Sequence, residues 1–234
     1  MCGRFSTCRK PPLPDATRDH EYDQAFRFWR LLAETSAAFG RSRALVNTAA
    51  PIVFSNALWY PEPESVAEAR DFYSEQRVLP SCFLSSALDD DLLQTLALTN
   101  AGFSCTARYG FSPVTASQPS DVNVEQVSWA QTRTLGEVIA AKYALSPYAV
   151  AVGQALALAL QLEKAVGAFI AYDGKPVGAM VTLESESLTA FALEALSPEA
   201  DAALRARLAF EAETRGKRAF MLEPTQTGGF ELWR

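Results

Sequence analysis

The chain has 234 residues, of which 49% are hydrophobic and 21% are charged. A chain of this length and composition can bury one large core or two small ones, so disorder over most of its length is not expected. The formal net charge of −6 argues against a general nucleic-acid or anionic-membrane binder, because neutralising phosphate groups requires a basic surface.

The sequence also argues against a membrane or secreted protein. The most apolar stretch, residues 148–162, is shorter than the roughly 18–20 residues that a membrane span requires. The opening residues MCGRFSTCRK are basic but have no apolar segment behind them, so they do not form a secretion signal. We therefore expect a cytoplasmic protein without membrane contact.

The first half of the chain predicts alternating strands and helices after a polar start. Residues 1–20 are polar and contain prolines, which predicts an N-terminal arm. Apolar residues recur at helical spacing over 21–39 and predict a helix that Gly40 ends. The patterns that follow predict a strand at 50–60, a helix at 64–77, a strand at 79–86, a helix at 89–103 and a strand at 104–114.

The composition changes at TASQPSD, residues 115–121, which we interpret as a linker between an N-terminal lobe, 21–114, and a C-terminal lobe, 122–234. Asp173-Gly174 is a strong hairpin turn in the second lobe. Its patterns predict a strand at 122–131, helices at 131–144 and 147–164, three antiparallel strands within 167–196, a helix at 198–215 and a strand at 218–224. The closing strand–helix–strand order favours a parallel pair.

The cysteines and the single histidine narrow the possible chemistry. Cys2, Cys8, Cys82 and Cys105 do not match the C-x2-C spacing of zinc sites, so we expect free thiols and no metal. His20 is the only histidine and lies in the polar arm. Unless His20 folds back into a cleft, the chain has no histidine base for most Ser–His–Asp or Cys–His mechanisms.

Four consecutive segments of the second half carry a family resemblance: FIAYDGKPVGAMVTLE, SLTAFALEALSPE, ADAALRARLAFEAETRG and KRAFMLEP. In this order they resemble the GNAT (acyl-CoA N-acyltransferase) superfamily. The first half is similar to the strand–helix–strand–helix segments of two-lobed members, where a helix ends in a pair such as Gly102-Phe103. The resemblance covers roughly residues 45–224. It implies an α+β fold with a GNAT-like mixed sheet flanked by helices, in two packed lobes.

The resemblance also implies an activity, the transfer of an acyl group from acyl-CoA, with acetyl-CoA as the expected cofactor, to an amine on a small molecule or peptide. It implies that the strand ending at Ala195 and Leu196 pairs with the pantetheine arm. The start of the following helix, with Ala202, Ala203 and Leu204, would hold the diphosphate. Glu194 would be the general base. Tyr172 and Glu223 are further candidates, and a solvent-facing or arginine-paired glutamate is the alternative for Glu194.

The chain departs from the family at the diphosphate loop. The family loop has the form Q/R-x-x-G-x-G/A, whereas residues 199–204 read EADAAL. Glu199 and Asp201 would repel a diphosphate, at a cost of about 1 kcal/mol each at roughly 4 Å in a water-like dielectric. A second function therefore stays open, a catalytically degenerate GNAT-fold binding module that uses the cleft between the lobes.

The opening MCGRF provides a third interpretation. It resembles the start of the SOS-response-associated peptidase family, whose members bond covalently to abasic DNA through the cysteine after the initiator methionine. The α-amine and thiol of Cys2 can together capture an aldehyde once Met1 is removed. This resemblance implies a Cys2-dependent abasic-DNA crosslinking protein, although the acidic chain makes nucleic acid an unexpected partner.

Overall fold

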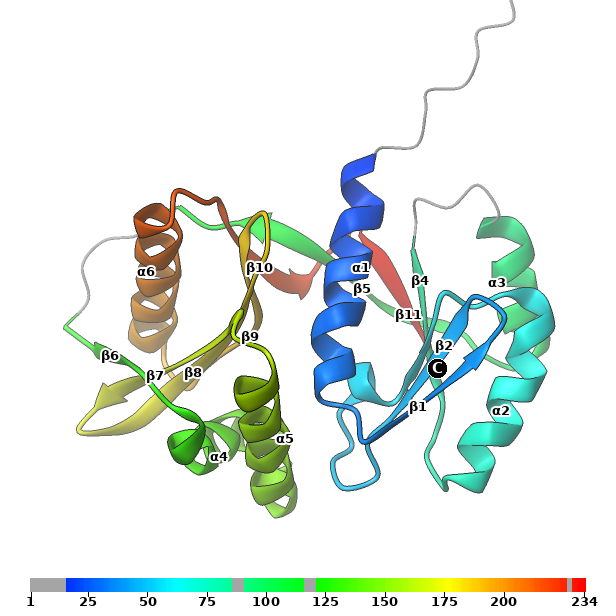
Figure 1. Cartoon of the computed structure of the whole chain (residues 1–234), viewed down its shortest axis with the longest axis horizontal. Helices are drawn as coiled ribbons and strands as arrows, with labels where there is room; N and C mark the ends of the chain where they lie inside the picture. The colour runs from blue at the N-terminus through cyan, green and yellow to red at the C-terminus, as the bar shows by residue number, and fades with distance from the viewer. Residues whose placement is uncertain (1–15, 86–90, 116–120, 227–228) are drawn as a thin grey trace, which may run out of the picture.

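Two lobes lie side by side in the structure (Figure 1). The structure is a computed structural model, and it describes residues 16–85, 91–115, 121–226 and 229–234. The elements up to residue 113 are α1 (Ala16–Leu31), β1 (Thr35–Phe39), β2 (Ser42–Val46), the 3-10 turn η1 (Val53–Ser55), β3 (Ala57–Trp59), η2 (Pro63–Ser65), α2 (Val66–Glu75), β4 (Ser81–Ser85), α3 (Asp91–Asn100) and β5 (Cys105–Pro113). The later elements are β6 (Asn123–Gln126), η3 (Trp129–Gln131), α4 (Thr132–Lys142), η4 (Ser146–Tyr148), α5 (Ala149–Leu162), β7 (Val166–Asp173), β8 (Lys175–Glu184), β9 (Leu188–Ala195), α6 (Pro198–Thr214), β10 (Ala219–Pro224) and β11 (Phe230–Trp233).

One mixed sheet of 11 strands runs through both lobes in the order β1-β2-β3-β4-β11-β5-β10-β9-β8-β7-β6. The α+β class with a mixed sheet flanked by helices is thereby confirmed. β11, which the sequence patterns do not predict, pairs antiparallel with β4 and β5. The end of the chain therefore lies in the N-terminal lobe, although by sequence it falls within 122–234. β5 also pairs with β10 and joins the two lobes.

The first predicted helix, 21–39, is wrong in its second half. α1 starts at Ala16, inside the segment predicted as an arm, and ends at Leu31. Residues 35–39 form β1 instead, which pairs antiparallel with β2. Gly40, at φ +60°, turns the chain between these two strands. The glycine that a helical pattern interprets as a stop is thus the first residue of a hairpin turn.

The predicted strand at 50–60 is shortened to β3, because side chains hold the preceding residues in a loop. Asn56 donates through Nδ2 to the carbonyl oxygen of Ala50 at 2.9 Å and accepts through Oδ1 from the Asn47 amide at 2.8 Å. Such side-chain-to-backbone bonds compete with strand pairing. The loop that results places residues 51–54 next to α1, where they line a cavity between the lobes.

Helices cover both faces of the C-terminal part of the sheet, with α6 on one side and α4 and α5 on the other (Figure 1). The alternation of side chains along β7 shows this division. Ala168 and Ile170 belong to the core that includes α4 and α5, whereas Phe169 belongs to the core under α6. Any feature that reaches both helix layers must therefore pass through the sheet.

Two glycines allow α4 and α5 to approach each other backbone to backbone. A Cβ atom on Gly136 would lie 2.3 Å from the carbonyl oxygen of Ala149, and one on Gly153 would lie 2.7 Å from that of Thr132. Real Cβ atoms do not come this close to backbone. The helix pair is therefore fixed tightly, and with it the end of α4 that carries Tyr143.

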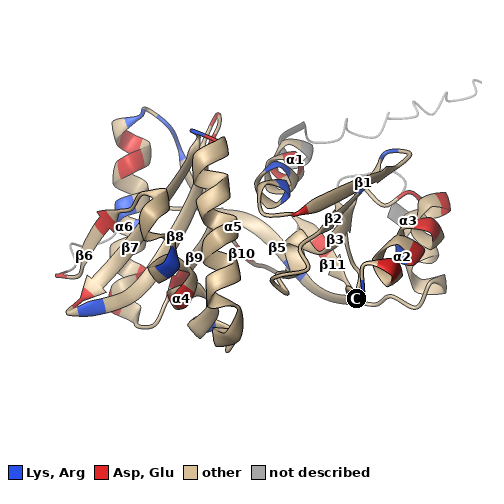
Figure 2. Ribbon diagram, turned by 60° about the horizontal axis from the view of Figure 1, so that its bottom comes forward, with Lys and Arg blue, Asp and Glu red and all other residues tan. Residues whose placement is uncertain are grey.

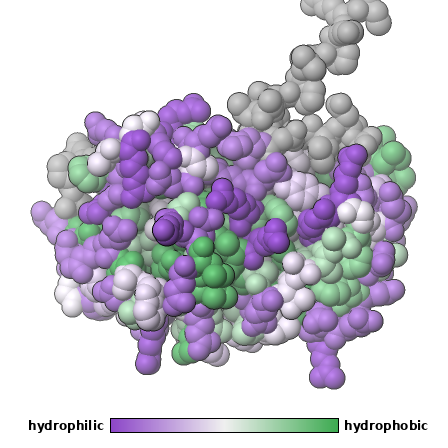
Figure 3. All heavy atoms as spheres, viewed as in Figure 1, coloured by the Kyte–Doolittle hydropathy of each residue, from purple (hydrophilic) through white to green (hydrophobic). Residues whose placement is uncertain are grey.

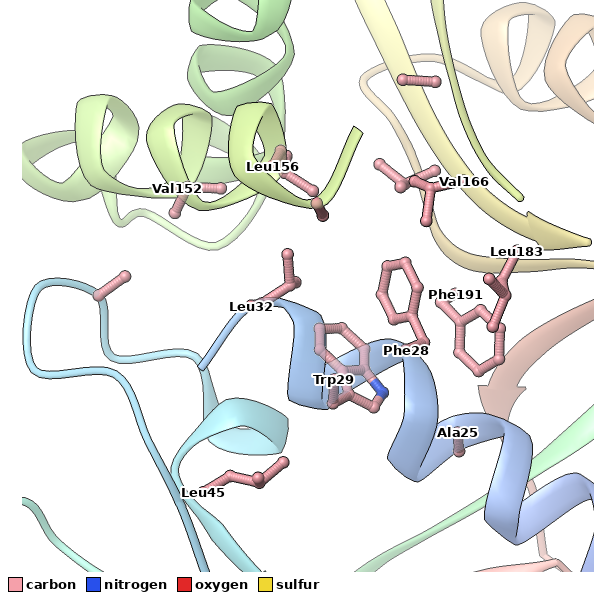
Figure 4. Packing of buried hydrophobic residues seen from close by; sticks show 14 of the residues in the cluster. Ala25, Phe28, Trp29, Leu32, Leu45, Val152, Leu156, Val166, Leu183 and Phe191 are labelled. Atoms are coloured by element: carbon pink, nitrogen blue, oxygen red, sulfur yellow. The ribbon is translucent and has the colours of Figure 1, made fainter. Parts of the chain in front are cut away.

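α1 lies between the two lobes, and its apolar side chains contact both (Figure 4). Phe28 stacks on Phe191 of β9 with 4.5 Å between the ring centroids. The next residue, Trp29, stacks on Phe54 of η1, also at 4.5 Å. Because α1 shares one apolar cluster with residues of both lobes, it sets the width of the space between them.

The surface combines mixed charge with exposed apolar side chains on α5. Lys, Arg, Asp and Glu are spread over both lobes, whereas α5 carries no charged residue (Figure 2). Its side chains Val150, Leu158 and Leu162 are exposed. Figure 3 shows an apolar patch near the middle of the face that it draws. Within the described ranges, every helix is too short or too polar to cross a membrane.

Candidate active site

The parallel pair formed by β9 and β10 separates part-way along its length. The two strands are paired over three positions, of which Ala190↔Met221 is the last. Beyond that point β9 continues to Ala195 along β8, and β10 continues to Pro224 along β5. These described segments are no longer hydrogen-bonded to each other, so their facing edges leave a V-shaped gap. Backbone groups at such an edge can bond the amides of a ligand.

A β-bulge accounts for the separation. The register of β8 and β9 places Val181 opposite Ala192 but Thr182 opposite Ala190, so Phe191 is an extra residue on β9. A bulge bends the strand that contains it and increases its local twist. Because the extra residue follows directly after the last residue paired with β10, β9 turns away from its neighbour at this point.

The side chain of Phe191 anchors the apex of the gap. It is only 4% exposed, and it contacts Phe28 of α1 and the edge of Phe111 of β5, with ring centroids 4.5 and 5.6 Å away. Aromatic pairs in such geometries add stabilisation beyond the area that they bury. The bulge is thus held in place by packing against elements of the other lobe.

A cavity of about 540 Å³ lies over the gap and between the lobes. Most of its walls are apolar, and they come from α1, the loop with η1, α4, α5, β9 and β10. Arg205 of α6 also lines it, although α6 covers the face of the sheet opposite α4 and α5. The cavity therefore reaches both faces through the gap. Its ionisable lining residues are Tyr109, Tyr143, Glu194, Arg205 and Glu223.

Glu194 lies on the separated part of β9 and is half-buried. Burial raises the pKa of its carboxyl group, and a hydrogen bond from Tyr143 together with the nearby ammonium of Lys142 opposes this increase. The Tyr143 hydroxyl donates to Oε1 of Glu194. The carboxylate thus has a tyrosine as partner instead of an arginine, and its raised pKa brings it closer to the range that suits a general base.

Two further polar groups reach the cavity from the strands between the lobes. Tyr109 belongs to β5, and burial raises the pKa of its phenol against the opposing effect of Arg234, with Glu194 adding to the increase. The phenol therefore keeps its proton at neutral pH and can donate a hydrogen bond. Glu223 of β10 accepts a hydrogen bond from the Ser112 hydroxyl.

The start of α6 is occupied by its own cap. Ser197 accepts a hydrogen bond at Oγ from the Ala200 amide at 3.2 Å, and Pro198 has no amide hydrogen. Asp201 pairs with Nε of Arg205 at 2.6 Å. Anion binding at a helix start depends on amides that point outward without partners. This helix start therefore offers a diphosphate few donors and two nearby carboxylates, those of Glu199 and Asp201.

Comparison with known proteins finds similarity in structure and not in sequence. No family model and no curated protein matches the chain. A GCN5-related N-acetyltransferase from Kribbella flavida has a TM-score of 0.61 at 14% identity, covering 91% of this chain and 94% of that one. The chain has a GNAT-like fold.

Two further solved structures agree with this fold. A functionally unknown conserved protein from Staphylococcus epidermidis also has a TM-score of 0.61 at 14% identity, with 86% of this chain and 92% of that chain covered. A GCN5-related N-acetyltransferase from Sphaerobacter thermophilus has a TM-score of 0.53 at 10% identity, with coverages of 76% and 71%. The GNAT-like fold class predicted from the sequence is confirmed.

The predicted site residues lie in different parts of this GNAT-like fold. Of the six, only Glu194 lines the cavity. Ala195 and Leu196 follow it at the end of β9, where the Ala195 carbonyl oxygen accepts from Lys142 Nζ at 3.1 Å. Ala203 and Leu204 are buried residues of α6, and Ala202 is half-buried beside them. Cofactor binding by these five residues stays a prediction.

Other members of the site come from elements far apart in sequence. Tyr143 follows α4 and Tyr109 lies on β5, so only the packing of the lobes brings them to Glu194. Neither stands in a local motif that would mark it. Glu223, a further candidate for the base, lines the cavity, whereas Tyr172 on β7 does not.

The structure describes two of the four cysteines, Cys82 and Cys105. Cys82 is a buried free thiol whose pKa burial raises, and Cys105 is an exposed free thiol. Cys2 and Cys8 lie outside the described residues, so the predicted Cys2 chemistry with abasic DNA stays a prediction. Among the side chains that the structure describes, no group of three or more His, Cys, Asp or Glu is placed to hold a metal ion.

Proposed function

We propose that the protein is an N-acyltransferase that transfers an acyl group from an acyl thioester such as acetyl-CoA to an amine. The observation that carries this proposal is the gap between β9 and β10 at the floor of a cavity that contains Glu194. An extended arm with amide groups can pair with the free strand edges in the way that a peptide adds to a sheet.

The residues of the cavity match the proton transfers that this reaction needs. The amine nitrogen bonds to the acyl carbon while the carbon–sulfur bond breaks, and Glu194 receives the proton that the nitrogen loses. Tyr109 and Tyr143 are neutral phenols in the same cavity, and burial raises the pKa of both above the ordinary value, so each keeps its O–H group at neutral pH. One of them supplies the proton that the leaving thiolate takes up.

The fit of the donor differs between its two ends. The gap and the apolar cavity suit the acyl group and the pantetheine arm. The capped, acidic start of α6 does not suit the diphosphate, since Ser197 already bonds an amide and Asp201 holds Arg205. We therefore propose that the donor is held mainly through its pantetheine arm, with little contribution from the nucleotide.

The same helix start favours a second candidate, a GNAT-fold binding module without catalysis. Calorimetry with millimolar acetyl-CoA and with S-acetylpantetheine, which lacks the nucleotide, distinguishes the two. An acyltransferase of the proposed kind binds both with similar affinity and releases thiol when an amine is added. Absence of heat with both donors, and of thiol release, would support the binding module and contradict our proposal.

A pair of variants tests the assigned base. Glu194→Gln removes the carboxylate but keeps the shape of the side chain, so thiol release should fall while donor binding is retained. Glu64→Gln makes the same change at an exposed position of η2 in the other lobe and should leave both unchanged. Equal rates for the two variants would remove Glu194 from the mechanism.

A further inference from the structure

The lining of the cavity that comes from α1, η1 and β9 is strongly aromatic. Trp29 and Phe54 stack with an angle of 13° between their rings, and Phe28 stacks on Phe191 at 12°. All four line the cavity. Flat aromatic walls of this kind bury an apolar or aromatic body well.

Acidic groups outnumber basic ones in the lining of this cavity. Glu194 and Glu223 contribute carboxylates to the lining, one from each of the two separated strands. Arg205 is the single basic residue among the described lining residues, and its guanidinium already pairs with Asp201 at 2.6 Å. The Lys142 ammonium, which lies near Glu194, donates to the Ala195 carbonyl oxygen at 3.1 Å. The lining therefore presents two carboxylates to a ligand cation, and both of these basic groups already have partners.

Together these features define the acceptor. Resting on the proposed function, we infer that the acceptor is a primary amine on an apolar, aryl-sized body without a carboxylate, such as an arylalkylamine, held between the aromatic wall and the carboxylates of Glu194 and Glu223. The ammonium group pairs with the carboxylates, and the body lies against Trp29 and Phe54. Ordinary amino acids bind less well, because their carboxylate meets two like charges.

The volume of the cavity is consistent with this assignment. Pockets for small ligands usually measure about 300–1,000 Å³. A cavity of about 540 Å³ is large enough for an aryl amine together with the acyl end of a thioester arm. A peptide could place only one terminal or side-chain amine in it, whereas a small amine is enclosed whole, so the volume favours the small-molecule class of acceptor.

Binding of three matched probes to the full chain, without any acyl donor, tests the inference. Phenethylamine carries the cation, phenylalanine adds a carboxylate, and phenethyl alcohol is neutral. By calorimetry we expect phenethylamine to bind at least about tenfold more tightly than either of the other two. Phenylalanine binding as tightly as phenethylamine would overturn the inference, and so would equal binding of the alcohol.

The variants Glu194→Gln and Glu223→Gln should each weaken phenethylamine several-fold and leave phenethyl alcohol unchanged, whereas Glu64→Gln should change neither. If a variant lost binding of both phenethylamine and phenethyl alcohol, its cavity would be disturbed. This result would contradict the proposal that the replaced glutamate acts through its charge alone. Since no donor is present, failure of the transferase proposal does not affect this result. Selective amine binding without thiol release contradicts the catalytic proposal alone, and transfer to phenylalanine at the rate of phenethylamine contradicts the acceptor assignment alone.

Discussion

Each lobe contains a strand–helix–strand unit with parallel neighbours, β3-α2-β4 in the first lobe and β9-α6-β10 in the second. Three residue pairs join the strands in both cases. In the first lobe these pairs include every residue of β3, which is 3 residues long. In the second lobe they include only the start of β9, which is 8 residues long. We call the first unit closed, because its parallel pairing runs the whole length of β3, and the second open, because β9 continues beyond the pairing.

The comparison shows what turns a structural unit into a site. After Trp59 the chain leaves the sheet at Tyr60, whose φ is +54°, and the ring of Trp59 packs on Phe83 at 4.7 Å. The first strand therefore ends where its pairing ends, and aromatic rings fill the space. In the second lobe the bulge at Phe191 lets β9 continue without its parallel neighbour. The free edge that results is the floor of the cavity.

The largest effect should come from the base on the open strand. Glu194→Gln should lower kcat/KM about 10²–10⁴-fold, the range typical of losing a general base. Glu64→Gln in the closed lobe should retain the rate of the unchanged protein. Steady-state assays of thiol release measure both, and a loss of less than about threefold for Glu194→Gln would show that the open strand does not supply the base.

The second prediction compares the cores of the two units. Phe191→Ala should lower the free energy of unfolding by about 3–5 kcal/mol, because a large buried side chain leaves a cavity. Leu58→Ala on β3, where the side chain is 1% exposed, should lower it by about 2–5 kcal/mol. Under conditions where both variants stay folded, as denaturant melts define, only Phe191→Ala should lose donor binding. Equal donor affinities would show that Phe191 does not maintain the gap.

The third prediction concerns the helix starts of the two units. Asp201→Asn removes a carboxylate from the start of α6 and releases Arg205 from its pair. We expect acetyl-CoA to bind about two- to fivefold more tightly, since charges near a helix start contribute about 0.3–1 kcal/mol. S-acetylpantetheine should be unaffected.

Glu68→Gln, which removes a carboxylate from the first turn of α2, is the matched control and should change neither affinity. If Asp201→Asn bound both donors more tightly, the carboxylate of Asp201 would act on the pantetheine arm. This result would contradict the proposal that the start of α6 affects only the nucleotide end of the donor.

The smallest effect should be a displacement of the pH profile. A general base must be ionised, so kcat/KM should decrease on the acid side as the pH falls through the pKa of Glu194, which burial raises above the ordinary carboxyl range. The hydrogen bond from Tyr143 lowers this pKa. Tyr143→Phe should therefore move the acid limb to higher pH, and a limb that moves to lower pH would exclude this pairing in solution.

Local patterns predict much of this fold, and the errors have physical causes. The hairpin at Asp173-Gly174, the helix that becomes α6 and the parallel strand after it all follow from turn residues, periodicity and caps. β11 is short, and its partners β4 and β5 are more than a hundred residues earlier, so no local pattern predicts its pairing. The segment of β1 fits a helical spacing equally well, and only the pairing with β2 decides its state.

The site is less predictable than the fold. Glu194 is predicted because the resemblance marks its strand, and the structure places it in the cavity. The bulge at Phe191 does not require a particular residue type, so the sequence does not reveal it. Tyr109 and Tyr143 reach Glu194 only through the packing of β5 and α4, and the occupied start of α6 depends on the geometry of Ser197.

Hydrogen–deuterium exchange with S-acetylpantetheine tests the central claim most directly, because it reports on both units in one sample. We expect amides of residues 192–195 on β9 and 222–223 on β10 to exchange more slowly when the thioester is bound, since its arm pairs with their free edges. The amides of β3 and β4 should be unaffected. Protection that is absent from β9 and β10, or that is equal in the two lobes, would contradict the account.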